Sequence, residues 1–88
     1  MKIYKYNLPI QGEIQITMPL ESEILTVQVI QEEAFIWVLV NPDSLDTIRT
    51  FRIVGIGHEF ADAHQCKYLG TFQLRGGEFI FHVFEFNP

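Results

Sequence analysis

Hydrophobic and polar residues alternate with a period of two over much of this chain. Residues 3–8 place tyrosine and leucine side chains on one face and Lys5 and Asn7 on the other. The same alternation recurs over residues 14–18 and 24–30. This period is typical of half-buried β-strands. No window of the sequence shows the 3.6-residue spacing of an amphipathic helix.

Four further segments favour strands, over residues 35–40, 49–54, 68–74 and 78–86. Residues 35–40 are apolar on both faces, which predicts a strand that is central in its sheet or covered on its outer side by another subunit. Turn signals separate the segments, among them a tight hairpin turn at Arg75-Gly76-Gly77. Seven short strands at this spacing predict one all-β domain over residues 1–88, an antiparallel β-sandwich or a small barrel.

Composition adds an expectation about assembly. The chain has 88 residues, of which 48% are hydrophobic and eight are Phe. This is more apolar surface than a lone small β-domain hides, so we expect a homo-oligomer, most simply a dimer. The predicted interface residues come from the two strands that are apolar on both faces, and they are Phe35, Trp37, Phe79, Phe81, His82 and Phe84. A histidine within so apolar a strand otherwise indicates a core residue with one hydrogen bond.

Net charge and cysteine content limit the kinds of partner and the compartment that we expect. The formal net charge is −5, and an acidic chain has few cations to release counterions from a nucleic-acid backbone, so we expect no nucleic-acid polymer as a partner. No apolar run is long enough to span a bilayer, and the amino-terminal residues do not resemble a signal peptide. Cys66 is the single cysteine, so no intrachain disulfide forms, which fits a reducing cytoplasm.

The most distinctive segment is residues 51–58, a predicted strand that runs into a glycine hinge. Gly55 and Gly57 precede His58, and a long irregular segment over residues 56–66 follows. The glycines either permit positive φ angles at a sharp turn, or their backbone N–H groups receive a ligand oxygen together with His58. The dinucleotide fingerprint is absent, because it needs a third glycine and a following helix.

Arg52 lies beside this hinge and between two apolar residues. Such an arginine has a specific partner, either a structural carboxylate or a bound anion. Arg49 precedes it by three positions, so the two arginines project to opposite faces of a regular strand, one of them as a solvated charge. The predicted ligand-binding site comprises Arg52, Gly55, Gly57 and His58.

Metal and catalytic interpretations find little support. His58, His64 and Cys66 are potential metal ligands, but their spacing matches no zinc pattern. No base–nucleophile arrangement with an oxyanion hole emerges from the sequence. We therefore expect a non-enzymatic protein without a metal or a cofactor.

The chain resembles a family of short uncharacterised proteins encoded by bacteriophages and prophages. The resemblance covers essentially the full length and rests on Lys2–Tyr6, Met18-Pro19, Ile24–Gln28, Trp37–Val40 with Pro42, Phe51–His58, Tyr68–Leu74 and Gly77–Glu85. Members of that family often carry threonine where this chain has Ile56.

The resemblance implies a biological setting, because small phage proteins often counter host defence in the host cytoplasm. This setting leaves two functions open. The first is an oligomeric binder of a small, nucleotide-like anion. The second is a module that blocks a host protein through its aromatic and acidic surfaces, since residues 1–48 carry the whole net charge of the chain and would suit a basic partner.

Overall fold

Seven β-strands account for most of the computed structural model, which describes residues 1–87. Two single-turn 3₁₀ segments, η1 (Ala63–Gln65) and η2 (Arg75–Gly77), accompany them, and no helix in this part of the chain is long and apolar enough to cross a membrane. The predicted all-β class is confirmed. The strands are β1 (Lys2–Leu8), β2 (Glu13–Pro19), β3 (Glu23–Ile30), β4 (Glu33–Val40), β5 (Asp46–Gly55), β6 (Cys66–Leu74) and β7 (Phe79–Phe86).

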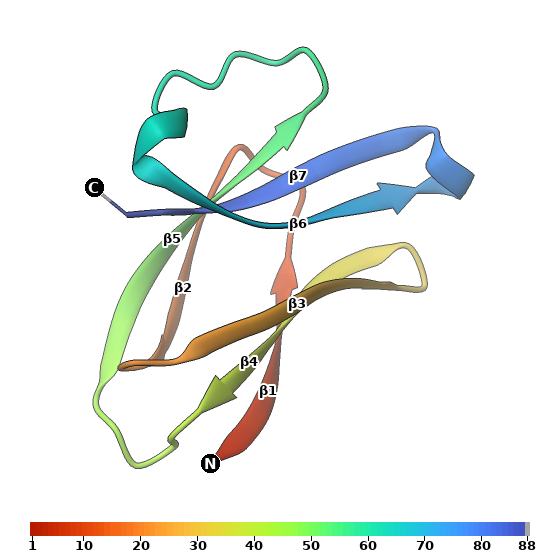
Figure 1. Ribbon diagram of the computed structural model, residues 1–88. Coiled ribbons are helices and arrows are strands. Elements are labelled where there is room, and N and C mark those ends of the chain that lie inside the picture. Colours follow the sequence, from red (N-terminus) through yellow and green to blue (C-terminus); the bar gives the residue numbers. More distant parts are fainter. Residues whose placement is uncertain (88) are drawn as a thin grey trace.

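The strands form two antiparallel sheets that pack against each other (Figure 1). One sheet has the order β1-β4-β3 and the other has the order β2-β5-β7-β6. Strand β4, predicted to be central or covered, lies in the middle of the three-stranded sheet. Its inward residues are buried, whereas its outward residues, including Phe35 and Trp37, are half-buried.

The core lies between the two inner faces, because the period-two alternation directs every second side chain there. Its fully buried members include Ile36 and Val38 from one sheet and Phe51 and Val83 from the other. Burying an aliphatic or aromatic side chain of this kind contributes about 1.5–3 kcal/mol. The strand pattern therefore supplies most of the stabilisation of this domain.

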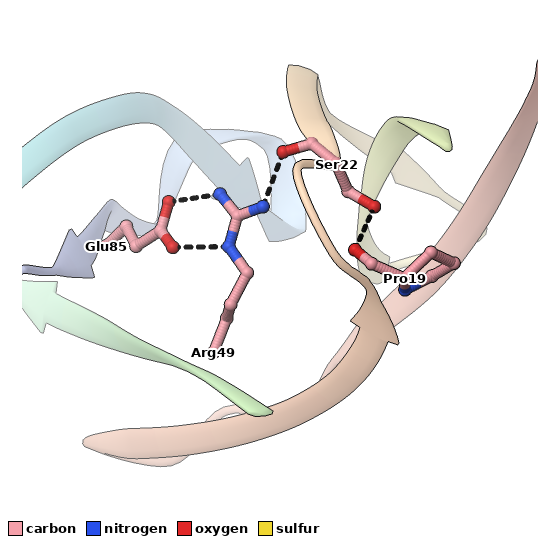
Figure 2. Close-up of polar contacts among 4 residues, drawn as sticks. All are labelled: Pro19, Ser22, Arg49 and Glu85. Atoms are coloured by element: carbon pink, nitrogen blue, oxygen red, sulfur yellow. Dashed lines mark hydrogen bonds and ion pairs between the residues drawn. The ribbon is translucent and has the colours of Figure 1, made fainter. Parts of the chain in front are cut away.

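A largely buried ion pair joins β5 to β7 (Figure 2). Two parallel hydrogen bonds join Arg49 to Glu85, from Nε to Oε2 at 2.6 Å and from Nη2 to Oε1 at 2.7 Å. The third guanidinium nitrogen donates to the carbonyl of Ser22, whose hydroxyl donates to the carbonyl of Pro19 at 2.6 Å. The guanidinium thus links β5 and β7 to the turn that leads into the other sheet. Neither arginine of β5 is the solvated charge that the sequence predicted for one of them.

Candidate functional site

An open hollow lies at the end of the sandwich where three connections meet. These are the β6–β7 turn, the β3–β4 tip and the segment between β1 and β2. Figure 1 shows the first two turns at the same end of the molecule. They are neighbours, because the backbone N–H of Arg75 donates a hydrogen bond to the carboxylate of Glu32. The hollow has a volume of about 420 Å³ and is lined mainly by apolar side chains, with Ile10, Glu32, Leu74, Arg75, Phe79 and Phe81 at its surface.

A second hollow of about 420 Å³ shares Phe79 and Phe81 with the first. It extends toward the end of β5, where Gly55 and His58 line it. A smaller recess of about 160 Å³ connects the two, because Ile10, Gly55, His58 and Phe81 all contribute to it. We refer to this continuous surface as the Phe81 hollow, formed by Ile10, Gly55, His58, Leu74, Arg75, Phe79 and Phe81.

Arg75 brings a positive charge to the rim of the Phe81 hollow. Its backbone has a positive φ of 51°, and its N–H donates to both carboxylate oxygens of Glu32, at 2.9 and 3.1 Å. The guanidinium carbon lies 5.6 Å from the ring centroid of Phe79, within the range of a cation–π contact. Within residues 1–87 the guanidinium makes no ion pair, so its N–H groups remain available to a ligand.

His58 reaches the hollow because the glycine hinge folds back on itself. Its backbone N–H donates to the carbonyl of Gly55 at 3.3 Å, and Gly57 between them has a φ of 81°. A positive φ of this size favours glycine, so the turn role predicted for Gly57 is confirmed. The imidazole rests directly on Gly55, where a Cβ atom would lie only 2.8 Å from Cε1. Gly57 itself does not line the hollow.

Arg52 does not join this site. Its Nη2 donates to Asp62 Oδ2 at 2.7 Å, and its Nη1 lies 3.0 Å from Glu13 Oε1. The second contact is electrostatic only, because Nη1 has no partner with hydrogen-bond geometry in the part of the chain that the structure describes. The guanidinium also covers the ring of Phe86, 4.5 Å from its centroid. Of the two roles predicted for Arg52, the structure therefore has the structural ion pair.

Strand register explains why the predicted site is divided. Arg52 pairs across the sheet with Glu13 and Phe84, which face outward, whereas Gly55 pairs with Phe81 on the inner side. Arg52 and Gly55 differ by three positions and so lie on opposite faces of β5. The structure brings Gly55 and His58 together with Phe79 and Phe81 but places Arg52 on the far side of the sheet.

The six predicted interface residues lie on three separate surfaces. Phe35 and Trp37 are on the outer face of the three-stranded sheet, with ring centroids 6.4 Å apart. His82 and Phe84 are on the outer face of the four-stranded sheet. The remaining two, Phe79 and Phe81, line the Phe81 hollow. One flat interface therefore cannot contain all six residues.

The ionisable side chains that line the hollows are Glu32, Arg75, His58 and Glu78. Within the described residues, no serine, threonine, cysteine or lysine lines them. Among residues 1–87, no group of three or more His, Cys, Asp or Glu side chains is arranged to hold a metal ion. The arrangement is suited to binding: an apolar surface with the guanidinium of Arg75, the imidazole of His58 and the carboxylates of Glu32 and Glu78 at its edges.

Sequence reasoning missed Arg75, Ile10 and Leu74 as site residues. Arg75 was assigned only to the predicted hairpin turn, which is confirmed. A cation placed next to two glycines and near Phe79 is a signal in the sequence. Ile10 carried no comparable signal, because its role depends on the distant turn that it faces.

These features define a class: a seven-stranded antiparallel β-sandwich with an aromatic hollow at one open end. A family model described as "Domain of unknown function (DUF7352)" matches residues 1–88. The chain belongs to this family. No curated protein and no solved structure matches it.

Proposed function

We propose that this protein is a non-enzymatic binding protein whose Phe81 hollow holds a small molecule with an aromatic ring and an anionic group, as in a nucleotide. The observation that carries the proposal is the guanidinium of Arg75, which makes no ion pair within residues 1–87 and lies at the rim of an apolar hollow of about 420 Å³. Pockets of roughly 300–1,000 Å³ are typical for small ligands. The rings of Phe79 and Phe81 supply a stacking surface, and Arg75 supplies the charge-assisted hydrogen bonds.

Two further groups support this assignment. His58 stands on the β5 side of the aromatic pair and Arg75 on the β6 side, so a ligand lying over Phe81 would have donors on both sides. Glu32 is already bound to the backbone N–H of Arg75, which directs its carboxylate to the turn. Binding rather than catalysis is favoured because the hollow offers no hydroxyl, thiol or amine to attack a substrate.

In the setting implied by the resemblance to bacteriophage proteins, such a protein would act in the host cytoplasm. It would sequester a nucleotide signal and so counter host defence. Sequestration needs affinity and abundance but no turnover, which agrees with a site that offers hydrogen-bond donors and an aromatic surface.

A thermal-shift screen followed by calorimetry tests the proposal. The probes are mononucleotides, cyclic dinucleotides, phenyl phosphate and inorganic phosphate. We expect nucleotides and phenyl phosphate to raise the Tm more than inorganic phosphate does, because only they fill the aromatic surface. No stabilisation by any of these compounds would overturn the proposal.

Two arginine substitutions separate the proposed site from the one predicted by the sequence. Arg75→Gln should weaken binding of the best nucleotide by about 10- to 150-fold, the equivalent of a charge-assisted hydrogen bond of about 1.5–3 kcal/mol. Arg52→Gln is the matched control, since it removes the same charge from the outer face and should leave ligand affinity within about twofold. Equal losses in both variants, or a loss only in Arg52→Gln, would refute the assignment of Arg75.

A second candidate function rests on the outer face of the three-stranded sheet. Phe35 and Trp37 lie half-buried there at the centre of the sheet, and the Nζ atom of Lys5 is 4.7 Å from the centroid of Phe35. Aromatic residues of this kind are enriched in protein interfaces. The net charge of −5 on the whole chain would favour a basic region of a host protein as the partner. Loss of capture of such a protein in Trp37→Ser, with unchanged nucleotide binding, would support this candidate.

A further inference from the structure

The outer face of the four-stranded sheet carries few charged side chains. Cross-strand pairing aligns Glu13, Arg52, Phe84 and Tyr68 in one row across β2, β5, β7 and β6. Arg52 lies 3.0 Å from Glu13 and also binds Asp62 of the segment after β5, and the remaining charged side chain that strand pairing places on this face over residues 13–17, 46–54, 68–73 and 80–86 is Asp46, at the start of β5. Depletion of charge together with aromatic residues is the composition of the centre of a protein interface.

Large apolar side chains on this face are exposed to solvent. Ile48 is 63% exposed and Tyr68 is 55% exposed. Phe84 lies between the rings of Tyr68 and Phe60, at centroid distances of 5.5 and 4.8 Å. The result is a continuous aromatic surface over β6 and β7. Burying this surface against a partner would lower the free energy of the assembly.

Polar groups on the same face are already paired with one another. The Tyr68 hydroxyl and Thr71 Oγ1 are 2.6 Å apart, and Thr71 Oγ1 is 2.9 Å from Nδ1 of His82. Arg52 is held by Asp62. Because these groups have partners within the chain, covering them with a second apolar surface does not leave them unsatisfied.

Charge indicates which partner fits this face. The chain as a whole carries −5, so two copies repel each other through most of their surfaces. The outer face of the four-stranded sheet has few charges, and Arg52 offsets part of the charge of its carboxylates, so two copies can meet there with less like-charge repulsion than elsewhere. A symmetric interface must also be complementary to itself, and a largely apolar and aromatic sheet meets that condition.

The area of the face agrees with a weak dimer. Four strands about 4.8 Å apart, each about eight residues long at roughly 3.3 Å per residue, give at most about 500 Å² of sheet, part of which Phe60 and Asp62 already cover. Two such faces bury no more than about 1,000 Å², which is the size of a weak interface. We infer that a second copy of this chain docks face to face on the β2-β5-β7-β6 sheet, forming a weak symmetric dimer.

Sedimentation equilibrium between about 1 and 300 μM tests this inference. We expect the mass of the wild type to rise with concentration from 10.2 kDa toward twice that value. Ile48→Glu and Tyr68→Glu should each hold the protein at the monomer mass over the whole range, because each places a charge in the proposed interface. Circular dichroism of each variant checks that the strands are retained.

Ile3→Glu is the matched control, because Ile3 is 64% exposed and its Cα partner is Leu39 on the other sheet. It makes the same change of charge outside the proposed interface and should dimerise like the wild type. A wild-type protein that stays monomeric at 300 μM overturns the inference. Dissociation by Ile3→Glu but not by Ile48→Glu would also overturn it, and would assign the contact to the three-stranded sheet.

Discussion

The imidazole of His58 rests on the backbone of Gly55, in the space where any other residue would place its Cβ atom. An ideal Cβ at position 55 would lie 2.8 Å from Cε1 and 2.9 Å from Nδ1 of the ring. The glycine hinge therefore does two things at once. Gly57 supplies the positive φ that reverses the chain, and Gly55 leaves room for the ring at the edge of the Phe81 hollow.

Gly55→Ala should displace the His58 ring with little loss of stability. The atoms that would collide belong to the end of a flexible side chain, so we expect a change in unfolding free energy below about 1 kcal/mol. The Cε1–H resonance of His58 should move in NMR spectra. In the Gly12→Ala control this resonance should not move, because nothing lies within 4 Å of a Cβ there. An unchanged His58 resonance in Gly55→Ala would contradict the contact.

The Arg49–Glu85 pair should be among the most sensitive positions in the molecule. Glu85 is 8% exposed and accepts two hydrogen bonds from Arg49. Arg49→Met would leave a buried carboxylate unpaired, and we expect a cost of about 3–5 kcal/mol in urea denaturation. Replacing both residues by apolar ones should cost less than the single change, because no charge is then stranded. A loss below about 1 kcal/mol for Arg49→Met would contradict this account.

Sequence pattern predicted the seven strands because each carries its own evidence in the alternation of side chains. The opposite faces of Arg49 and Arg52 follow from the same period. The sequence pattern could not identify the ion-pair partners of these arginines. Glu85 is 36 residues from Arg49, and their contact depends on the pairing of β5 with β7. The sequence therefore grouped Arg52 with Gly55 and His58, whereas strand register places Arg52 and Gly55 on opposite faces of β5.

The candidate site also combines residues with a local signal in the sequence and residues placed only by long-range contacts. Gly55 and His58 were found because residues 51–58 are locally distinctive. Arg75 was missed because its position depends on the β6–β7 turn meeting Glu32 of the β3–β4 tip, 43 residues away in the sequence. A candidate surface assembled from four connections cannot be recognised in the sequence before the strand order is known.

Close approach of the two sheets gives a further prediction. A Cβ at Gly70 would lie 3.0 Å from Cγ2 and 3.2 Å from Cβ of Val27, so a methyl group at this position fits only if Val27 moves. Gly70→Ala should lower the free energy of unfolding by about 1–3 kcal/mol, as overpacking does. Val27→Ala in the same chain should restore part of that loss by making room. The free energies come from chemical denaturation, and full additivity of the two losses would exclude the proposed clash.

The reactivity of the Cys66 thiol should depend on pH in a way that reflects its surroundings. Burial raises the pKa of the Cys66 thiol, the carboxylate of Asp62 adds to the rise, and Arg52 opposes it. Since the thiolate is the reactive form, iodoacetamide at pH 8 should modify the folded protein more slowly than a free cysteine peptide. The unfolded chain loses this proton first as the pH rises, so the contribution of Cys66 to stability is present at neutral pH and declines in alkaline solution.

Asp62→Asn tests the cause of this pKa shift. It removes a charge that raises the pKa and leaves Arg52, which lowers it, so alkylation of Cys66 at pH 8 should become faster. Glu59→Gln is the control, because it neutralises another carboxylate of the same segment that is not among the causes of the shift. Equal acceleration in both variants would mean that loosening of the segment, rather than the charge of Asp62, governs access to the thiol. Measuring the rate across pH 7–10 separates these outcomes, because a pKa change moves the midpoint of the profile, whereas greater access raises only its plateau.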